Sequence, residues 1–233
     1  MKPLPLNPTA SPARTQTRRK GFTLVEALVV MGIAGMLMAG VLSFYQQAGL
    51  ILFTSEQKLR INKDIRTLTN EMTDNARNAN HFVLYESFEE GMRTAETEQE
   101  AMEYRLRDGE SGDMIVLVFY GEDPNPGDNV LPPIERLVGY FRAPDPETRR
   151  GPVRKFDLAV PAADQNEVVE FLLPPVSSRD SYPEVVELSE GLADGKLFYN
   201  FRDRSIMVNG QIFHGNAAKR VTDTYNFTIS PRG

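Results

Sequence analysis

The sequence predicts an α+β protein in which one long N-terminal helix is followed by an antiparallel β-sheet. Two observations predict this fold. Residues 50–81 contain no Pro or Gly, and their apolar side chains recur at helical spacing. From residue 114 onward, short apolar and β-branched runs alternate with turns rich in Gly, Pro, Asn and Asp. The helix comes first and the strands follow it, which is the order of an α+β fold.

Composition narrows the classes of protein that the chain can belong to. It has 233 residues, of which 41% are hydrophobic, so it is long enough for one domain and a membrane segment. It has no cysteine. Disulfides, thiolate metal sites, iron–sulfur clusters and cysteine nucleophiles are therefore excluded.

Charge is distributed unevenly along the chain, whose net charge is −6. The charged residues of 1–21 are all basic: Lys2, Arg14, Arg18, Arg19 and Lys20. The rest of the chain holds 21 basic and 32 acidic residues, a net charge of −11. Such an acidic body argues against nucleic acid as a partner. The basic start is typical of the cytoplasmic flank of a membrane segment.

The membrane segment extends from Phe22 to Tyr45 and contains a single charged residue, Glu26. A helix of about 20 apolar residues spans the hydrocarbon core of a bilayer. The run is too long for the apolar part of a cleaved secretory signal, and no small-residue cleavage site follows it. Glu26 lies near the start of the segment. It is either a carboxylate tolerated at the headgroups or a functional group.

The residues around Glu26 carry a recognisable motif. A basic run, Arg18, Arg19 and Lys20, precedes Gly21, Phe22 and then Glu26 at the fifth position from Phe22. Residues 18–50 resemble the prepilin signal and apolar helix of the type IV pilin superfamily. In that superfamily a membrane peptidase cuts after the Gly and methylates the new N-terminal residue. The resemblance implies cleavage between Gly21 and Phe22, with Glu26 serving filament assembly.

The resemblance also implies partners and a location. We expect prepilin peptidase, other pilin or pseudopilin subunits, an inner-membrane assembly platform and, before assembly, membrane lipid. The protein would be a single-pass protein of the bacterial inner membrane, with its N-terminus cytoplasmic and its C-terminal domain periplasmic, and would later enter a filament. A new amine on Phe22 would pair with Glu26 of a neighbouring subunit.

Helical periodicity continues beyond the membrane segment, which predicts one helix from about Thr23 to about Asn80. Its stripe consists of Ile61, Ile65, Leu68, Met72, Ala76 and Ala79. We expect this stripe to lie on a sheet, and a free coiled coil is the alternative. The resulting division is a cleaved leader (1–21), a membrane or filament-core half-helix (22–53), an amphipathic half-helix (54–80) and an exported β-rich domain (81–233), which together form a pilin-like lollipop.

Strands are predicted from apolar and β-branched runs in the exported domain. They are expected at 114–120, 135–143, 154–160, 167–173, 197–203, 205–214 and 225–230, with a short helix or strand within 94–109. Asn209 and Gly210 have the composition of a hairpin turn.

Residues that could perform chemistry are few. The two histidines, His81 and His214, are too few for a zinc site, and His81 at the helix exit is expected to be structural. The stretch 191–196, GLADGK, lacks the spacing of a phosphate-binding loop. The loop at 121–129, with Glu122, Asp123, Asp128 and Asn129, is either an ordinary turn or a calcium site. The sequence therefore predicts no enzyme, no cofactor and no metal.

Two classes of function remain after this search. The first is a structural filament subunit, and the second is an unprocessed, signal-anchored periplasmic binding protein. The layout of the exported domain resembles the minor pseudopilins of the type II secretion J or pilus W kind. Such subunits sit at the tip of a secretion pseudopilus or type IV pilus. The Gly21–Phe22 junction with Glu26 favours the filament subunit.

Overall fold

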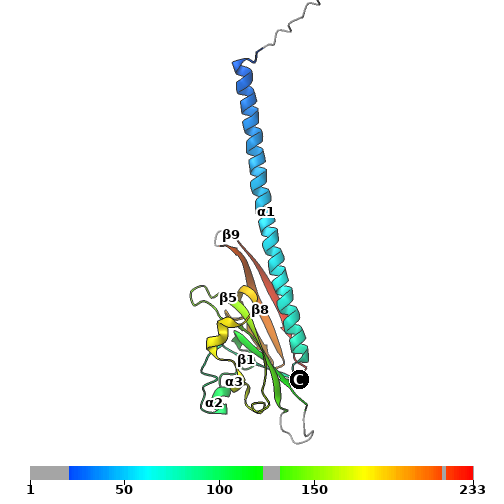
Figure 1. Ribbon diagram of the computed structural model, residues 1–233, viewed down its shortest axis with the longest axis vertical. Helices are drawn as coiled ribbons and strands as arrows, with labels where there is room; N and C mark the ends of the chain where they lie inside the picture. Colours follow the sequence, from blue (N-terminus) through cyan, green and yellow to red (C-terminus); the bar gives the residue numbers. More distant parts are fainter. Residues whose placement is uncertain (1–20, 123–131, 217–218, 233) are drawn as a thin grey trace, which may run out of the picture. The chain divides into compact units, whose positions relative to one another are not determined.

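The computed structural model describes residues 21–122, 132–216 and 219–232, and within them the predicted α+β fold is confirmed. A long helix, α1 (Leu24–Asn78), is followed by an antiparallel β-sheet. The chain divides into two compact units, one ending at Ile51 and the other beginning at Leu52. Figure 1 shows the order of the elements along the chain.

The first unit contains the apolar part of α1, up to Ile51. Its large apolar side chains are exposed within this unit on every side of the helix, as in Leu28, Met36 and Phe44. This segment is long and apolar enough to cross a membrane.

The second unit begins with the last part of α1, which carries the amphipathic stripe. Ile61, Leu68, Met72 and Ala76 are fully or almost fully buried. They belong to one apolar cluster with side chains of the sheet, such as Leu117 and Val208. The prediction that the stripe lies on a sheet is therefore confirmed, and the coiled-coil alternative is wrong.

The sheet has nine strands among the described residues, in the order β1-β3-β4-β5-β6-β8-β7-β2, and β9 pairs with β8. The strands are β1 (His81–Tyr85), β2 (Ser111–Gly112), β3 (Met114–Tyr120), β4 (Ile134–Arg142), β5 (Gly151–Ala159), β6 (Glu184–Gly191), β7 (Phe198–Phe201), β8 (Ser205–Asn216) and β9 (Lys219–Ile229). Every pairing is antiparallel. Short helices are α2 (Glu98–Met102), α3 (Val169–Leu172) and a 3₁₀ turn, η1 (Val176–Ser181).

Both faces of the central strands are buried, which explains why β3 is a continuous apolar run. Ile115 and Leu117 join the cluster on the α1 side of the sheet. Met114, Val116 and Val118 join a second cluster on the opposite face. That second cluster is completed by side chains from the segment after β1 and from α3: Phe88, Met92, Val169 and Leu173.

The strands expected at 114–120, 135–143, 154–160, 197–203, 205–214 and 225–230 are confirmed, with shifts of a few residues and with β9 beginning earlier, at Lys219. The short helix expected within 94–109 is α2. The strand expected at 167–173 is wrong, because Val169–Leu172 is helical. The helical turn buries Val169 and Leu173 together and also buries Glu170, which an alternating strand would place on the opposite face.

The hairpin turn expected at Asn209-Gly210 is also wrong, since both residues lie inside β8. Gly210 pairs with Gly191 of β6 and with Tyr225 of β9, so β8 is held on both edges there. A Cβ atom at Gly210 would lie 2.7 Å from the Tyr225 hydroxyl. The glycine therefore allows close packing and does not mark a turn. The strands β1, β2 and β6 are not among the predicted ones.

Truncation of the stripe should destabilise the second unit. We expect Leu68→Ala to lower the free energy of unfolding by about 2–5 kcal/mol, because Leu68 is fully buried and its removal leaves a cavity. Urea unfolding of the full chain in detergent micelles, followed by near-ultraviolet circular dichroism, measures this. Leu59→Ala on the same helix is the control, since Leu59 is 70% exposed and should change stability by less than about 0.5 kcal/mol. Equal effects of the two variants would contradict the packing described here.

Candidate functional site

The start of α1 is the first candidate site, and its geometry centres on Thr23 and Glu26. The backbone and side-chain donors of Thr23 each lie 3.4 Å from Oε2 of Glu26. In return, the Glu26 amide donates to the Thr23 hydroxyl at 3.3 Å. This reciprocal pattern is a capping box, which satisfies backbone donors that the first helical turn leaves unpaired. A carboxylate at this end also interacts favourably with the helix dipole.

The predicted processing residues lie directly before this cap. Gly21 and Phe22 precede the helix, and Phe22 is 81% exposed. Among the described residues, and apart from its neighbours in the chain, no atom lies within 4 Å of the position that a Cβ atom would take at Gly21. The predicted basic flank, Arg18, Arg19 and Lys20, lies outside the described residues. The structure thus brings Glu26 together with Thr23. Thr23 is not among the site residues predicted from the sequence, although the Thr-x-x-Glu spacing of a capping box is present there.

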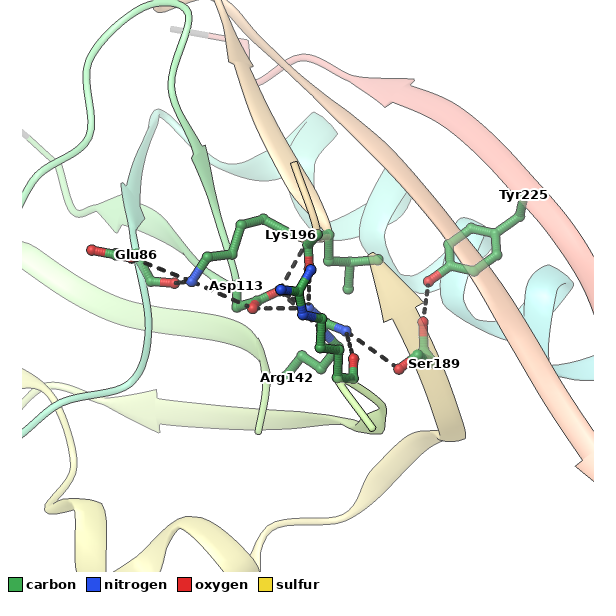
Figure 2. Close-up of polar contacts among 9 residues, drawn as sticks. Glu86, Asp113, Arg142, Ser189, Lys196 and Tyr225 are labelled. Carbon is green, nitrogen blue, oxygen red and sulfur yellow. Dashed lines mark hydrogen bonds and ion pairs between the residues drawn. The ribbon is translucent and has the colours of Figure 1, made fainter. Parts of the chain in front are cut away.

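The second candidate is a buried charge cluster in the sheet, drawn in Figure 2. Asp113 lies between β2 and β3, and Arg142 ends β4. Their side chains are both 1% exposed, and two guanidinium nitrogens of Arg142 contact the two carboxylate oxygens of Asp113 at 2.9 Å each. The Arg142 amide also donates to the Asp113 carbonyl at 2.8 Å. The cluster is therefore held by both backbone and side chains.

The remaining N–H groups of Arg142 bind backbone carbonyls. They donate to Arg149 at 2.8 Å, to Ser189 at 3.4 Å and to Gly195 at 2.6 Å. Two of these acceptor residues have left-handed backbones, with φ of 56° at Arg149 and 81° at Gly195. Such a conformation costs energy at Arg149, which carries a side chain. Through these hydrogen bonds, Arg142 therefore connects the turns that contain Arg149 and Gly195 to the sheet.

Lys196 and Tyr225 lie at opposite sides of this cluster (Figure 2). The Lys196 ammonium lies 3.8 Å from Asp113 and 3.5 Å from the Glu86 carboxylate. The Tyr225 hydroxyl lies 3.1 Å from that of Ser189, and burial raises the pKa of Tyr225 to about 12. Burial also raises the pKa of Asp113, against the opposing effect of Arg142. Lys196, the lysine of the stretch 191–196, thus lies beside the carboxylates of Asp113 and Glu86.

The chemistry open to this cluster is limited by how fully its groups are paired. The guanidinium of Arg142 uses its donors on Asp113 and on three carbonyls. Asp113 additionally accepts from the Leu197 amide at 3.1 Å. A group paired in this way is arranged to hold a fold together and has no proton or lone pair directed at a substrate.

A further buried carboxylate, Glu170 of α3, is held in the same manner. Its carboxylate accepts hydrogen bonds from the Arg105 guanidinium at 2.6 and 2.8 Å and from the Tyr85 hydroxyl at 2.7 Å. Burial and the neighbouring Glu170 raise the pKa of Tyr85. This contact explains why a charged residue is tolerated in the short helix that replaces the expected strand.

The histidines lie apart from one another. His81 begins β1, and burial lowers its pKa. His214 of β8 lies 2.8 Å from Asp64 of α1 and 3.5 Å from Glu187 of β6. In the part of the chain that the structure describes, no group of three or more acidic or histidine side chains is placed to hold a metal ion. Of the loop at 121–129, for which an ordinary turn and a calcium site were the two alternatives, Glu122 is described, and Asp123, Asp128 and Asn129 lie outside the described residues.

The first unit thus contains an apolar helix long enough to cross a membrane, and the second unit contains a buried polar cluster whose groups are paired with one another. Comparison with known families makes this more specific. Residues 16–42 match the family described as the prokaryotic N-terminal methylation motif. This prepilin-type motif on a long apolar helix supports membership of the type IV pilin superfamily. No curated protein and no solved structure matches the chain.

The motif has consequences for function. It supports a prepilin-type substrate of prepilin peptidase that assembles with other pilin subunits. It favours a structural subunit over an enzyme. The single apolar helix is consistent with a single-pass membrane anchor.

The buried pair should dominate the stability of the sheet end to which it belongs. We expect Arg142→Met to cost about 3–5 kcal/mol in the free energy of unfolding, because it removes the guanidinium partner of the buried Asp113 carboxylate and leaves it only the Leu197 amide and the more distant Lys196. Arg136→Met is the matched control. Arg136 pairs with Asp157 at 2.6 Å, but both side chains are 43% exposed, and such a pair contributes about 1 kcal/mol or less. Urea midpoints of the two variants measure the difference, and equal losses would contradict a structural role specific to Arg142.

Proposed function

We propose that the chain is a prepilin that is cut between Gly21 and Phe22, methylated on Phe22, and assembled into a type II secretion pseudopilus or type IV pilus. The observation that carries this proposal is the match to the methylation motif at residues 16–42, which contains Gly21, Phe22 and Glu26. The open surroundings of Gly21 support it, because a peptidase needs an accessible, extended backbone. Arg18, Arg19 and Lys20 would keep the leader on the cytoplasmic side of the inner membrane.

Filament assembly would use the apolar part of α1. Its side chains are exposed in the first unit, so they need lipid before assembly and neighbouring subunits afterwards. Before cleavage, Thr23 supplies hydrogen bonds to Glu26. Cleavage would create an amine on Phe22, and Glu26 of one subunit would pair with the Phe22 amine of its neighbour. An ion pair in a medium of low dielectric constant would set the axial register of the subunits.

Within a filament, we assign the chain to the minor subunits of the type II secretion J or pilus W kind, at the tip. The size of the region after α1, residues 81–233 with its sheet of nine described strands, supports this assignment. The division would be a leader (1–21), a membrane or filament-core half-helix (22–53), an amphipathic half-helix (54–80) and an exported domain (81–233). An inner-membrane assembly platform would complete the set of partners.

A bulky residue at the cleavage position should block processing. We expect Gly21→Ile to leave the leader attached, because the side chain obstructs the peptidase at the scissile bond. Gly32→Ile is the matched control, since it makes the same change inside the span, where a Cβ atom also meets nothing within 4 Å. Gel mobility of the two variants in native cells distinguishes leader-bearing from cut protein. A Gly21→Ile protein that is cut as well as the control would contradict the proposed junction.

Removing the charge of Glu26 should impair assembly but not cleavage. We expect Glu26→Gln to be processed and to enter sheared filaments at about one tenth of the normal level or less. A loss of about 1.4 kcal/mol of pairing energy lowers the equilibrium constant of assembly tenfold. Glu56→Gln on the same helix is the control, because Glu56 makes an exposed pair with Arg60. Immunoblots of membrane and filament fractions measure the ratio. Normal incorporation of Glu26→Gln would refute the proposed pairing with Phe22.

A further inference from the structure

Strand β5 has one edge that is only partly used. On one side it pairs with β4 from Arg136 opposite Ala159 to Arg142 opposite Val153. On the other side it pairs with β6 only at Gly151, Val153 and Arg154, with two irregularities in register. The second half of β5 therefore continues beyond the point where β6 begins.

The backbone groups that face this open side can be identified. The Lys155 amide donates to the Pro183 carbonyl, so residue 155 directs its backbone groups away from β4. Because the direction alternates along an antiparallel strand, Asp157 and Ala159 do the same. Both are exposed, and their backbone groups have no hydrogen-bond partner among the described residues. They form a free strand edge.

A cleft of about 610 Å³ lies beside this edge. We call it the α1–β5 cleft. Its lining comes from three parts of the second unit: Lys63, Asp64, Thr67 and Glu71 of α1, Lys155, Phe156 and Asp157 of β5, and residues 182–185 at the start of β6. The helix forms one wall, and the open edge of β5 forms the other. The cleft thus occupies the place that a longer β6 would fill.

Glu71 supplies a second, independent observation. Its Oε2 atom is buried, yet it has no hydrogen-bond partner among the described residues. Most buried polar atoms in proteins are paired, because leaving one unpaired costs about 1–3 kcal/mol. Glu71 is only partly buried as a residue and lines the cleft, so a rotation of its carboxylate toward the cleft would bring Oε2 to a donor placed there.

We infer that the α1–β5 cleft binds an extended segment of another filament subunit, which adds as a strand to β5 beside Asp157 and Ala159 and places a Lys or Arg side chain on Glu71. The backbone of the added segment supplies the N–H and C=O groups that the free edge lacks. Its basic side chain supplies the donor that the Glu71 carboxylate lacks. The inference rests on the proposed function, since it takes the partner from the same filament.

Cross-linking in the bacterium that makes the protein tests this inference. The photo-reactive residue p-benzoyl-phenylalanine replaces Thr67, which is exposed and lines the cleft. The matched control carries it at Asn62, which is exposed on the same helix but does not line the cleft. Mass spectrometry of the digested adduct identifies the attached peptide. The expected result is an adduct at Thr67 alone, to a Lys- or Arg-bearing segment of one other filament subunit.

Two backbone variants make the test specific for strand addition. Ala159→Pro removes the free N–H of the edge and leaves the pairing with β4 intact, because that N–H points away from β4. Ala159→Val keeps the N–H. We expect the Thr67 adduct to fall at least about tenfold in Ala159→Pro and to persist in Ala159→Val. An adduct that survives in a folded Ala159→Pro protein overturns the inference.

A second pair of variants covers the case in which Ala159→Pro does not fold. Glu71→Arg places a cation against the basic side chain of the added strand, and the adduct should be lost. Asp74→Arg makes the same change at an exposed position of α1 outside the cleft lining and should leave the adduct unchanged. Equal adducts in these two variants, an adduct at Asn62 as strong as at Thr67, or a partner that is not a filament subunit each overturn the inference.

The intact mass of the same preparation separates the two proposals. A processed chain that enters filaments but forms no adduct at Thr67 refutes strand addition alone. A chain that keeps residues 1–21 refutes the proposed function, and with it the assignment of the partner to the same filament.

Discussion

The constraint on which the rest of the structure depends is that one helix must satisfy two different environments. Up to Ile51, the apolar side chains of α1 are exposed within their own unit, so they are stable only in lipid or against other subunits. From Leu52 onward, a narrow stripe centred on Ile61, Leu68 and Met72 is buried by the sheet of the second unit. The same helix is therefore apolar and long enough to cross a membrane in its first part and contributes to a folded core in its last part.

Within the second unit, Arg142 connects several elements that lie far apart in the sequence. It joins Asp113 to the turns that contain Arg149 and Gly195 and to the backbone of β6 at Ser189. The charge of Arg142 thus stabilises the fold, since every N–H donor of its guanidinium is directed at another group of the protein. Where pairing is incomplete, at the edge of β5 and at Glu71, the chain has the features of a surface that another polypeptide completes.

The sequence predicted the helix and most strands well because their signals are local. The absence of Pro and Gly and the spacing of the stripe defined α1, and the run at 114–120 defined β3. The errors arose where tertiary contacts decided the outcome. Asn209-Gly210 lies inside β8 because the strand is paired on both edges, and Val169–Leu172 is helical because Glu170 meets Arg105 and Tyr85. The Asp113–Arg142 pair joins residues that are distant in the sequence, so no local sequence pattern predicts it.

The measurement that tests the central claim most directly is the intact mass of the protein extracted from native membranes. If the chain is a processed prepilin, it begins at Phe22 and carries one added methyl group on its amine. That mass would establish the processing for which the motif at residues 16–42 and the exposed Gly21–Phe22 junction are evidence. A chain that retains residues 1–21 would contradict the account, and Glu26 would then be the capping residue of an ordinary membrane anchor.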